Sequence, residues 1–415
     1  MSLRSTAERT FSSLANANYR KYFLGQSTSL VGTWMQSTAQ SWLVLVLTHS
    51  ATAIGVVVAL QTLPVLLLGP YGGVIADRVD KRRFLIVLQS LMGVQAAVLA
   101  VFTLLHDVTY LDVCVLAVVL GLNNSFENPS RQAFMLEMVG PADLRNAVSL
   151  NSTMNNAARA VGPAVAGILI AAVGEGWCFV LNAVSFVAVV GSLVAMDRST
   201  LNPSPPAARE RGQLRAGFHY VAHTPALLIP LVMMGLVGTF AYEFQVTLPL
   251  VASQVFHGGS RAYGFLVTAM GVGAVIGGLV SAARGRVGIA PMVVASTIFA
   301  AVLAIASVAP LMALELVALA LVGFASVSFL SMANSTLQLA SDPAMRGRVM
   351  ALWAVAFLGS TPVGGPLVGL VTSHWGARVG LGVGALSCLV AASIGFAVLR
   401  RGKSSRVALV EGAAD

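Results

Sequence analysis

Residues 73–83 read Gly-Val-Ile-Ala-Asp-Arg-Val-Asp-Lys-Arg-Arg and lie between two long apolar runs. Six of the last seven residues of this stretch are charged, whereas charged residues make up only 10% of the chain. The chain of 415 residues is 57% hydrophobic, with a mean hydropathy of +0.82, which leaves too few polar groups to cover a water-facing surface. The stretch therefore predicts a charged loop between two membrane-spanning helices.

The apolar runs on both sides of this loop belong to a series that continues along the whole chain. A helix needs about 20 mainly apolar residues to cross the hydrocarbon core of a membrane. Twelve runs of that length predict an all-α integral membrane protein with twelve transmembrane helices. We expect these spans at Tyr22–Leu47, Ile54–Ala76, Phe84–Leu105, Leu111–Met135, Ala147–Val173, Trp177–Met196, Ala226–Val251, Tyr263–Ala283, Ile289–Pro310, Leu314–Leu339, Arg348–Ser373 and Trp375–Leu399.

The basic residues fix the expected orientation of these spans. If the N-terminus lies inside, 21 of the 25 Lys and Arg residues fall in inner segments, as the positive-inside rule requires. The remaining four are Arg261 and Arg378 in outer loops and Arg131 and Arg159 within spans. We therefore expect an even number of spans in the cell membrane with both termini in the cytoplasm. The net charge of +9 does not indicate nucleic-acid binding, because no basic domain with interleaved aromatic residues is present.

The two halves of the chain resemble each other. Val139–Arg145 enters the fifth span and Ser341–Arg346 enters the eleventh, and Gly162-Pro163 and Gly365-Pro366 follow them at matching positions. Halves with the same order and orientation predict parallel repeats of six helices each. The expected parts are an inner segment at 1–21, bundles at 22–196 and 226–399, a linker at 197–225 and an inner tail at 400–415.

The linker begins with Leu201-Asn-Pro-Ser-Pro-Pro206, which disfavours regular structure. Its second part places Leu214, Phe218 and Val221 at helical spacing opposite a basic face. This pattern predicts a helix along the inner membrane interface; a solvated helix is the alternative.

Ionisable side chains inside the spans are the first candidates for chemistry, because each costs at least about 2.5–3.5 kcal/mol at mid-depth. Glu127 and Arg131 lie four residues apart on one helical face and can pair. Glu127 could exchange a proton with the solvent or could form a permanent ion pair with Arg131 or Arg159. Arg159 could equally neutralise an anionic substrate. Glu243 has no basic neighbour in its span and is a candidate for proton coupling.

Two further groups of residues could serve a transport path. Asn123, Asn124, Gln36 and Gln40 belong to amide and hydroxyl clusters that either line a polar path or join helices by hydrogen bonds. The Gly162-Pro163 motif, with Gly167 in the same span, and the Gly365-Pro366 motif either introduce kinks that act during opening or permit close packing.

The sequence contains no H-E-x-x-H, no G-x-S-x-G and no phosphate loop, so we expect neither an enzyme nor direct use of ATP. Cys114, Cys178 and Cys388 lie in apolar runs without a C-x-x-C spacing, so we expect no disulfide framework, metal site or cofactor. Any uphill transport is then expected to use an ion gradient.

Three motifs carry a resemblance to a known family. They are Gly73 to Arg82 with its Ala-Asp-Arg core, Asn128-Pro-Ser-Arg-Gln-Ala133, and Gly162-Pro-Ala-x-x-Gly167. Together they resemble the loop signature, the N-P-A-R-Q-A element and the antiporter motif of the major facilitator superfamily, in its drug efflux branch that includes enterobactin and macrolide exporters. Asp80 and Ala166 stand where the family motifs have glycine.

The resemblance implies the major facilitator fold and alternating access between two six-helix bundles, coupled to inward proton movement. The expected function is export of an amphipathic small molecule, drug-like or siderophore-like, by a monomer. An importer, a facilitator or a lysolipid flippase of the same fold is the alternative, and a membrane enzyme or receptor is a distant one. In this interpretation Gly73, Asp77, Arg78, Lys81 and Arg82 form a cytoplasmic gate.

Overall fold

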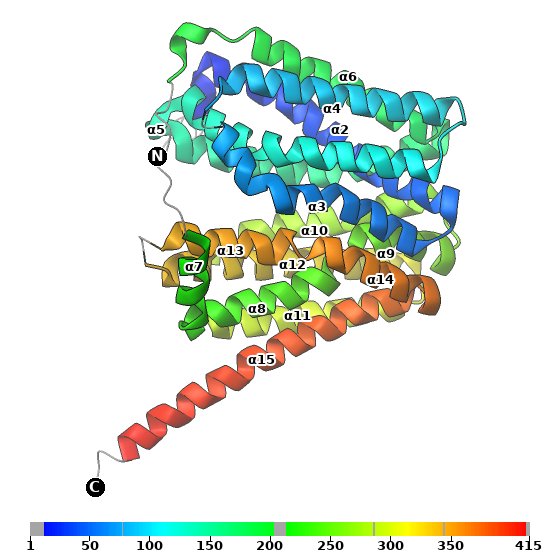
Figure 1. Ribbon diagram of the computed structural model, residues 1–415. Helices are drawn as coiled ribbons and strands as arrows, with labels where there is room; N and C mark the ends of the chain where they lie inside the picture. The colour runs from blue at the N-terminus through cyan, green and yellow to red at the C-terminus, as the bar shows by residue number, and fades with distance from the viewer. Residues whose placement is uncertain (1–11, 77, 203–212, 285–286, 343–344, 412–415) are drawn as a thin grey trace, which may run out of the picture. The chain divides into compact units, whose positions relative to one another are not determined.

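The computed structural model describes residues 12–76, 78–202, 213–284, 287–342 and 345–411, and all regular structure within these ranges is helical (Figure 1). Contacts divide the chain into two compact units. Unit 1 comprises Met1–Arg209 with Gly258–Thr268, and unit 2 comprises Glu210–His257 with Ala269–Asp415. The expected all-α fold is confirmed, whereas the exact boundaries of the two bundles stay predictions.

Unit 1 contains the first five long helices and two short 3₁₀ turns. Its members are η1 (Ser12–Ala15), α2 (Ala17–Thr48), α3 (Ala51–Ala76), α4 (Lys81–Leu104), α5 (Tyr110–Val173), α6 (Glu175–Val194) and η2 (Arg198–Thr200). Helix α10 (Ser260–Arg284) begins in unit 1 and ends in unit 2.

Unit 2 contains shorter helices, because several of its spans are interrupted. Its members are α7 (Gln213–Ala222), α8 (Pro225–Ala241), α9 (Phe244–Leu250), the π-helical turn η3 (Val251–Val255), the second part of α10, α11 (Ile289–Val308), α12 (Met312–Ala340), α13 (Arg346–Leu358), α14 (Thr361–Trp375) and α15 (Ala377–Glu411).

Ten helical segments of the described residues are long and apolar enough to cross a membrane. One of them is α5, whose 64 residues contain both the fourth and the fifth predicted spans. Helix α2 covers the first predicted span with 32 residues but is not among the ten. The chain is thus a multi-pass membrane protein, and the count of twelve spans stays a prediction.

Helix α5 changes direction at Gly140, the one residue within it whose backbone is not helical. Its φ of 72° and ψ of 174° lie in a region that is essentially restricted to glycine. Pro141 follows directly and cannot donate a backbone hydrogen bond. A glycine followed by a proline therefore makes the turn between two predicted spans without a separate loop.

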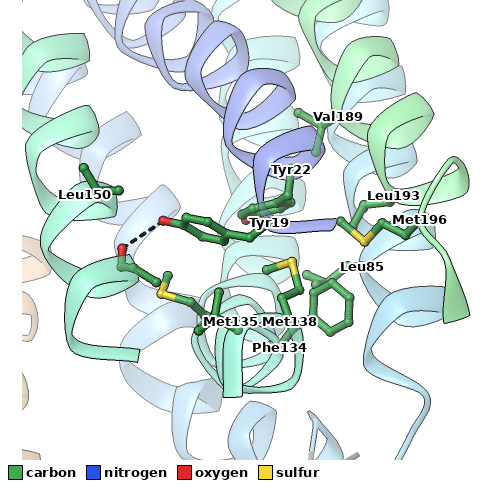
Figure 2. Packing of buried hydrophobic residues seen from close by; sticks show 12 residues of the cluster. Tyr19, Tyr22, Leu85, Phe134, Met135, Met138, Leu150, Val189, Leu193 and Met196 are labelled. Carbon is green, nitrogen blue, oxygen red and sulfur yellow. Dashed lines mark hydrogen bonds between the residues drawn. The ribbon is translucent and has the colours of Figure 1, made fainter. Parts of the chain in front are cut away.

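A cluster of buried side chains packs the helix ends around this turn (Figure 2). Tyr19 and Tyr22 of α2 lie among Phe134 and Met138 of α5 and Leu193 of α6. The Tyr19 hydroxyl donates a hydrogen bond to the carbonyl oxygen of Ala147 at 2.9 Å. This contact ties α2 to the second part of α5, beyond the Gly140 turn.

The helix interruptions of unit 2 do not fall at the predicted Gly-Pro motif. Pro366 lies inside α14, and the interruption instead lies at Gly359–Ser360, between α13 and α14. A second break at Tyr242–Glu243 separates α8 from α9. In unit 1, α5 likewise continues through Pro163. Helices α5 and α14 thus continue through Pro163 and Pro366, and the kink interpretation of the two Gly-Pro pairs stays a prediction.

The predicted linker helix is present as α7, which packs against α8 and α13. Val221 is buried in a cluster with Leu227 and Val349, whereas Phe218 on the same helix is 65% exposed. An exposed aromatic ring beside a buried valine suits a helix at an interface. The start of the linker, residues 203–212, lies outside the described residues.

Replacing Gly140 with alanine tests the turn in α5. A side chain forced into this backbone region costs about 1–3 kcal/mol, so Gly140→Ala should lower the melting temperature of the detergent-purified protein. Gly191→Ala is the matched control, because a Cβ there would meet no atom within 4 Å. Equal melting temperatures for the two variants would contradict the assigned role of Gly140.

Candidate functional site

The charged stretch that follows α3 forms the start of α4 rather than a long loop. Asp80 caps α4, since its carboxylate accepts a hydrogen bond from the backbone N–H of Arg83 at 3.0 Å. This cap explains why an aspartate is suitable where related sequences have glycine. Arg78 is exposed in the turn, and Asp77 lies outside the described residues.

Two basic residues of this stretch are buried inside unit 1. Lys81 Nζ lies 2.7 Å from Glu137 Oε1 of α5, and the two side chains are only 6% and 11% exposed. Arg82 donates hydrogen bonds to the carbonyl oxygens of Leu193 at 2.6 Å and Val194 at 2.8 Å, at the C-terminal end of α6. A cation at a helix C-terminus is favoured by the helix dipole. These contacts join the ends of α4, α5 and α6.

The same end of unit 1 is held by a second set of hydrogen bonds. Asn18 donates to the carbonyl oxygen of Asp197 at 2.7 Å and accepts from the Asp197 N–H at 2.9 Å. The hydroxyl and then the backbone N–H of Ser199 hold the pKa of Asp197 below its usual range. Asn202 donates its backbone N–H to the carbonyl oxygen of Glu137 at 2.9 Å. The segment after α6 is thereby fastened to α2 and to the residue that pairs with Lys81.

Glu127 is paired with Arg131 on the face of α5, as their spacing allows. Arg131 Nε lies 3.0 Å from Glu127 Oε1, with side-chain exposures of 12% and 6%. Gln89 of α4 donates a second hydrogen bond to the same oxygen at 3.1 Å. The geometry favours the ion-pair alternative for Glu127. Arg159 has a different neighbour, since its guanidinium lies over the Trp34 ring at 5.3 Å from the centroid.

The amide residues of unit 1 join helices to one another. Gln36 of α2 donates to Gln95 of α4 at 3.2 Å and accepts from Asn182 of α6 at 2.7 Å. Asn123 donates to the carbonyl oxygen of Leu88 at 2.8 Å. These contacts support the helix-joining alternative for Gln36 and Asn123. Asn124 is half-buried and Gln40 is buried.

Glycines of the predicted motifs lie at close helix contacts. A Cβ at Gly162 would lie 2.7 Å from Cβ of Trp34, so this glycine lets α5 approach α2. At the end of α3 the close contact is made by Gly72, where a Cβ would overlap the carbonyl oxygen of Ser125. Gly73 is half-buried beside it, and Gly167 and Gly365 are buried in α5 and α14.

Glu243 of unit 2 lies at the break between α8 and α9, with φ −83° and ψ 41°. The residue is 4% exposed, and its Oε1 atom is buried without a hydrogen-bond partner. The side chain of Thr361, the first residue of α14, forms a hydrogen bond with the carboxyl group. Within the described part of the chain this carboxyl group has one hydroxyl partner and no cation beside it, unlike the paired Glu127.

The surroundings of Glu243 leave a small space on one side. A cavity with room for about one water molecule is lined by Glu243, Thr247, Leu303, Gly380 and Gly384, among others. On the other side, α14 approaches at Gly364, where a Cβ would lie 2.9 Å from Glu243 Oε1 and would overlap the carbonyl oxygen of Thr239. The carboxyl group is thus enclosed by α8, α9, α14 and α15, and it borders a space in which a water molecule fits.

Two acidic residues with notable environments were not predicted from the sequence. Glu137 follows the end of the predicted fourth span, where the sequence suggests an ordinary solvated charge at a helix end. Glu315 stands in the first turn of α12, yet it is 0% exposed and neither carboxylate oxygen has a hydrogen-bond partner. Glu315 is the second residue of the predicted tenth span, and this position within an apolar run was the sequence feature that could have identified it.

Comparison with known proteins places the chain among transporters. Residues 8–409 match the family model described as transmembrane secretion effector. The staphyloferrin A transporter of Staphylococcus aureus is 29% identical over 263 residues, which cover 63% of this chain and 66% of that protein. The enterobactin exporter of Escherichia coli O127:H6 is 25% identical over 397 residues, covering 95% and 92% of the two chains.

Solved structures support the fold. A bacterial homologue of the human lysosomal transporter Spinster, in an inward-facing state, has a TM-score of 0.75 at 12% identity and covers 92% of this chain and 96% of its own. A peptide transporter has a TM-score of 0.76 at 13% identity, covering 93% and 95%. At these identities the similarity establishes the architecture and nothing about substrates.

The buried pair of Lys81 and Glu137 can be tested by stability. Lys81→Met removes the buried cation that lies 2.7 Å from the Glu137 carboxylate, and breaking a buried pair costs about 3–5 kcal/mol. The variant should therefore unfold at a clearly lower temperature in detergent, and Lys81→Met combined with Glu137→Gln should recover part of the loss.

Arg83→Met is the control for this measurement. Arg83 pairs with Asp80 at 3.4 Å, but the two side chains are 68% and 51% exposed, and such pairs contribute about 0–1 kcal/mol. A Lys81→Met variant no less stable than Arg83→Met would refute the proposed importance of the buried pair.

Proposed function

Because the chain belongs to the transmembrane secretion effector family of the major facilitator superfamily, we propose that it exports a siderophore-like small molecule by proton antiport. The full-length similarity to a protein named as an enterobactin exporter supports the direction and the class of substrate. The partial similarity to a staphyloferrin A transporter supports the same class. The proposed location is the cell membrane, with both termini in the cytoplasm.

The observation that carries proton coupling is the environment of Glu243. An ionised carboxylate in a water-excluded site is costly unless it is paired and hydrogen-bonded, and here one oxygen has no partner. A neutral acid removes that cost, whereas an opening of the site to water restores the stability of the carboxylate. Glu243 therefore binds a proton when enclosed and releases it when hydrated.

The breaks in the helices beside Glu243 provide a route from protonation to movement. Glu243 lies at the α8–α9 break, and Thr361 follows the α13–α14 break at Gly359–Ser360. Tyr242 and Glu243 have non-helical backbone angles, whereas Gly359 and Ser360 join α13 to α14 with right-handed helical angles. Interrupted helices within membrane spans are tolerated where protein buries them, and we propose both interruptions as the positions at which the backbone bends. Loss of the proton changes the hydrogen bond between Glu243 and Thr361, and so alters the angle between the helix segments that carry them.

The charged stretch after α3 serves as the proposed cytoplasmic gate. Lys81 and Arg82 fix the start of α4 to α5 and α6, so that Gly73 and Arg78 are presented from a rigid support. Asp77, which lies outside the described residues, is assigned to the gate from the sequence alone. In this proposal unit 1 transmits movement as one body, because its inner helix ends are joined by buried ionic contacts. Arg159, beside Trp34 in unit 1, is the proposed contact for an anionic group of the substrate.

Transport into everted membrane vesicles tests the proton coupling, with enterobactin as the probe. An acidic lumen should drive accumulation of enterobactin by the wild-type chain, and collapse of the pH gradient should abolish it. Glu243→Gln should still bind enterobactin but should bring it only to equilibrium, because an amide cannot carry the proton.

Glu175→Gln is the matched control, since Glu175 is a half-buried carboxyl in the first turn of α6. Vesicles with this variant should accumulate enterobactin as wild-type vesicles do. Normal accumulation by Glu243→Gln would reject Glu243 as the proton carrier. Gradient-independent equilibration by the wild type would reject antiport and support a facilitator or a lipid flippase instead.

A further inference from the structure

Unit 2 contains a second carboxyl group that the proposed transport cycle does not use. Glu315 is 0% exposed and belongs to the first turn of α12, and both of its carboxylate oxygens are buried without a hydrogen-bond partner among the residues that the structure describes. A permanently ionised group would carry a large cost in this position. A structural carboxyl would be expected to have a bound cation or backbone donors, as Glu137 and Glu127 of unit 1 do.

One cation acts on Glu315, and it is Arg378 at the start of α15. Arg378 donates a hydrogen bond to the carbonyl oxygen of Ala309 at 3.1 Å, at the C-terminal end of α11. Helix α11 packs against both α12 and α15 (Figure 1) and has no ionisable side chain. Within 377–399, Arg378 is the one charged residue of α15. Arg378 thus attracts Glu315 electrostatically while its guanidinium is bonded elsewhere.

The helices beside Glu315 also form the cavity at Glu243. Leu303 of α11 and Gly380 and Gly384 of α15 line that cavity, and Gly380 follows Arg378 by only two residues. The two carboxyl groups therefore lie at different levels along the same packed helices. Glu315 is nearer the ends that are predicted to face outward, where α11 ends and α12 and α15 begin.

An unpartnered hydroxyl lies beside the cavity. The Oγ1 atom of Thr372 is buried without a hydrogen-bond partner, and a Cβ at Gly380 would overlap it and would lie 3.2 Å from Cγ2 of Thr247. Thr247 itself lines the cavity. Gly380 consequently leaves space for this hydroxyl beside the cavity at Glu243.

We propose that Glu315 is a proton-binding site through which protons from the outer side reach Glu243. In the forward step Glu315 gives up its proton, which reaches the Glu243 carboxylate through the water-sized cavity beside α15. Arg378 stabilises the Glu315 carboxylate that remains, and a proton from outside then restores the acid. The inference rests on the proposed proton antiport and adds the side and the route by which the proton enters.

Infrared spectroscopy of the full chain in lipid nanodiscs tests this route without a transported substrate. The C=O stretch of protonated carboxyl groups should lose one component in Glu315→Gln and a different one in Glu243→Gln. After mixing into D₂O, the Glu243 component should exchange about a hundredfold more slowly in Glu315→Gln than in the wild type, because a positioned proton donor is missing. Glu315→Asp should restore fast exchange.

Arg378→Gln is an independent variant, since it leaves both carboxyl groups in place. The Glu315 component should persist to higher pH in this variant, because the cation that favours the carboxylate has been removed. Absence of a Glu315 component at any pH, or unchanged exchange at Glu243 in Glu315→Gln, would overturn the inference. Either result would leave proton antiport through Glu243 intact, whereas gradient-independent transport in vesicles would reject antiport whatever the spectra show.

Discussion

The structure depends on one constraint, which the low dielectric of the membrane interior imposes. Each charged side chain, and each backbone N–H or C=O group freed by a helix interruption, must find its partner within the protein. Unit 1 meets this constraint with buried pairs. Lys81 binds Glu137, Glu127 binds Arg131, and Arg82 covers the free carbonyl groups at the end of α6. Each of these contacts joins two helices or stabilises one, so unit 1 is suited to move as a rigid body.

Unit 2 meets the same constraint differently. Its two buried carboxyl groups, Glu243 and Glu315, have oxygens without hydrogen-bond partners among the described residues. The helices beside Glu243 are broken at Tyr242–Glu243 and Gly359–Ser360. A proton-driven conformational change requires acids that are stable only when neutral and a nearby backbone that can bend. The two carboxyl groups and the two helix interruptions fit this requirement. In the proposed mechanism the two units divide the work, with paired charges for support in unit 1 and acids without hydrogen-bond partners for proton coupling in unit 2.

Much of the architecture could be predicted from the sequence, because membrane spans have a strong length and hydropathy signal. The positions of α3, α4, α6 and α11 follow the predicted spans closely. Asp80 could be recognised as a departure from the loop signature, but its role as a cap required the geometry of the Arg83 N–H. The Gly-Pro motifs predicted kinks at Gly162 and Gly365, whereas the helix interruptions of unit 2 lie at Tyr242–Glu243 and Gly359–Ser360, because glycine and proline favour a break without deciding which turn contains it.

The site residues were harder to predict than the spans. Glu243 stood out because an acid within an apolar run has few explanations, and the pairing of Glu127 with Arg131 followed from helical spacing. From the sequence, Lys81 was interpreted as a charged residue of a loop. Its partner Glu137 is 56 residues away, and only the fold brings the two side chains together. Glu315 lies so near a helix start that the sequence suggests a solvated end, whereas the packed helices around α12, such as α11, bury it.

The central claim is that substrate and proton compete through a buried acid in unit 2. The most direct measurement is proton release when enterobactin is added to the purified full chain in weakly buffered detergent solution, followed with a pH indicator. The account predicts that binding of enterobactin releases protons from the wild type and not from Glu243→Gln. Binding of enterobactin to the wild type with no change in bound protons across the neutral pH range would contradict it.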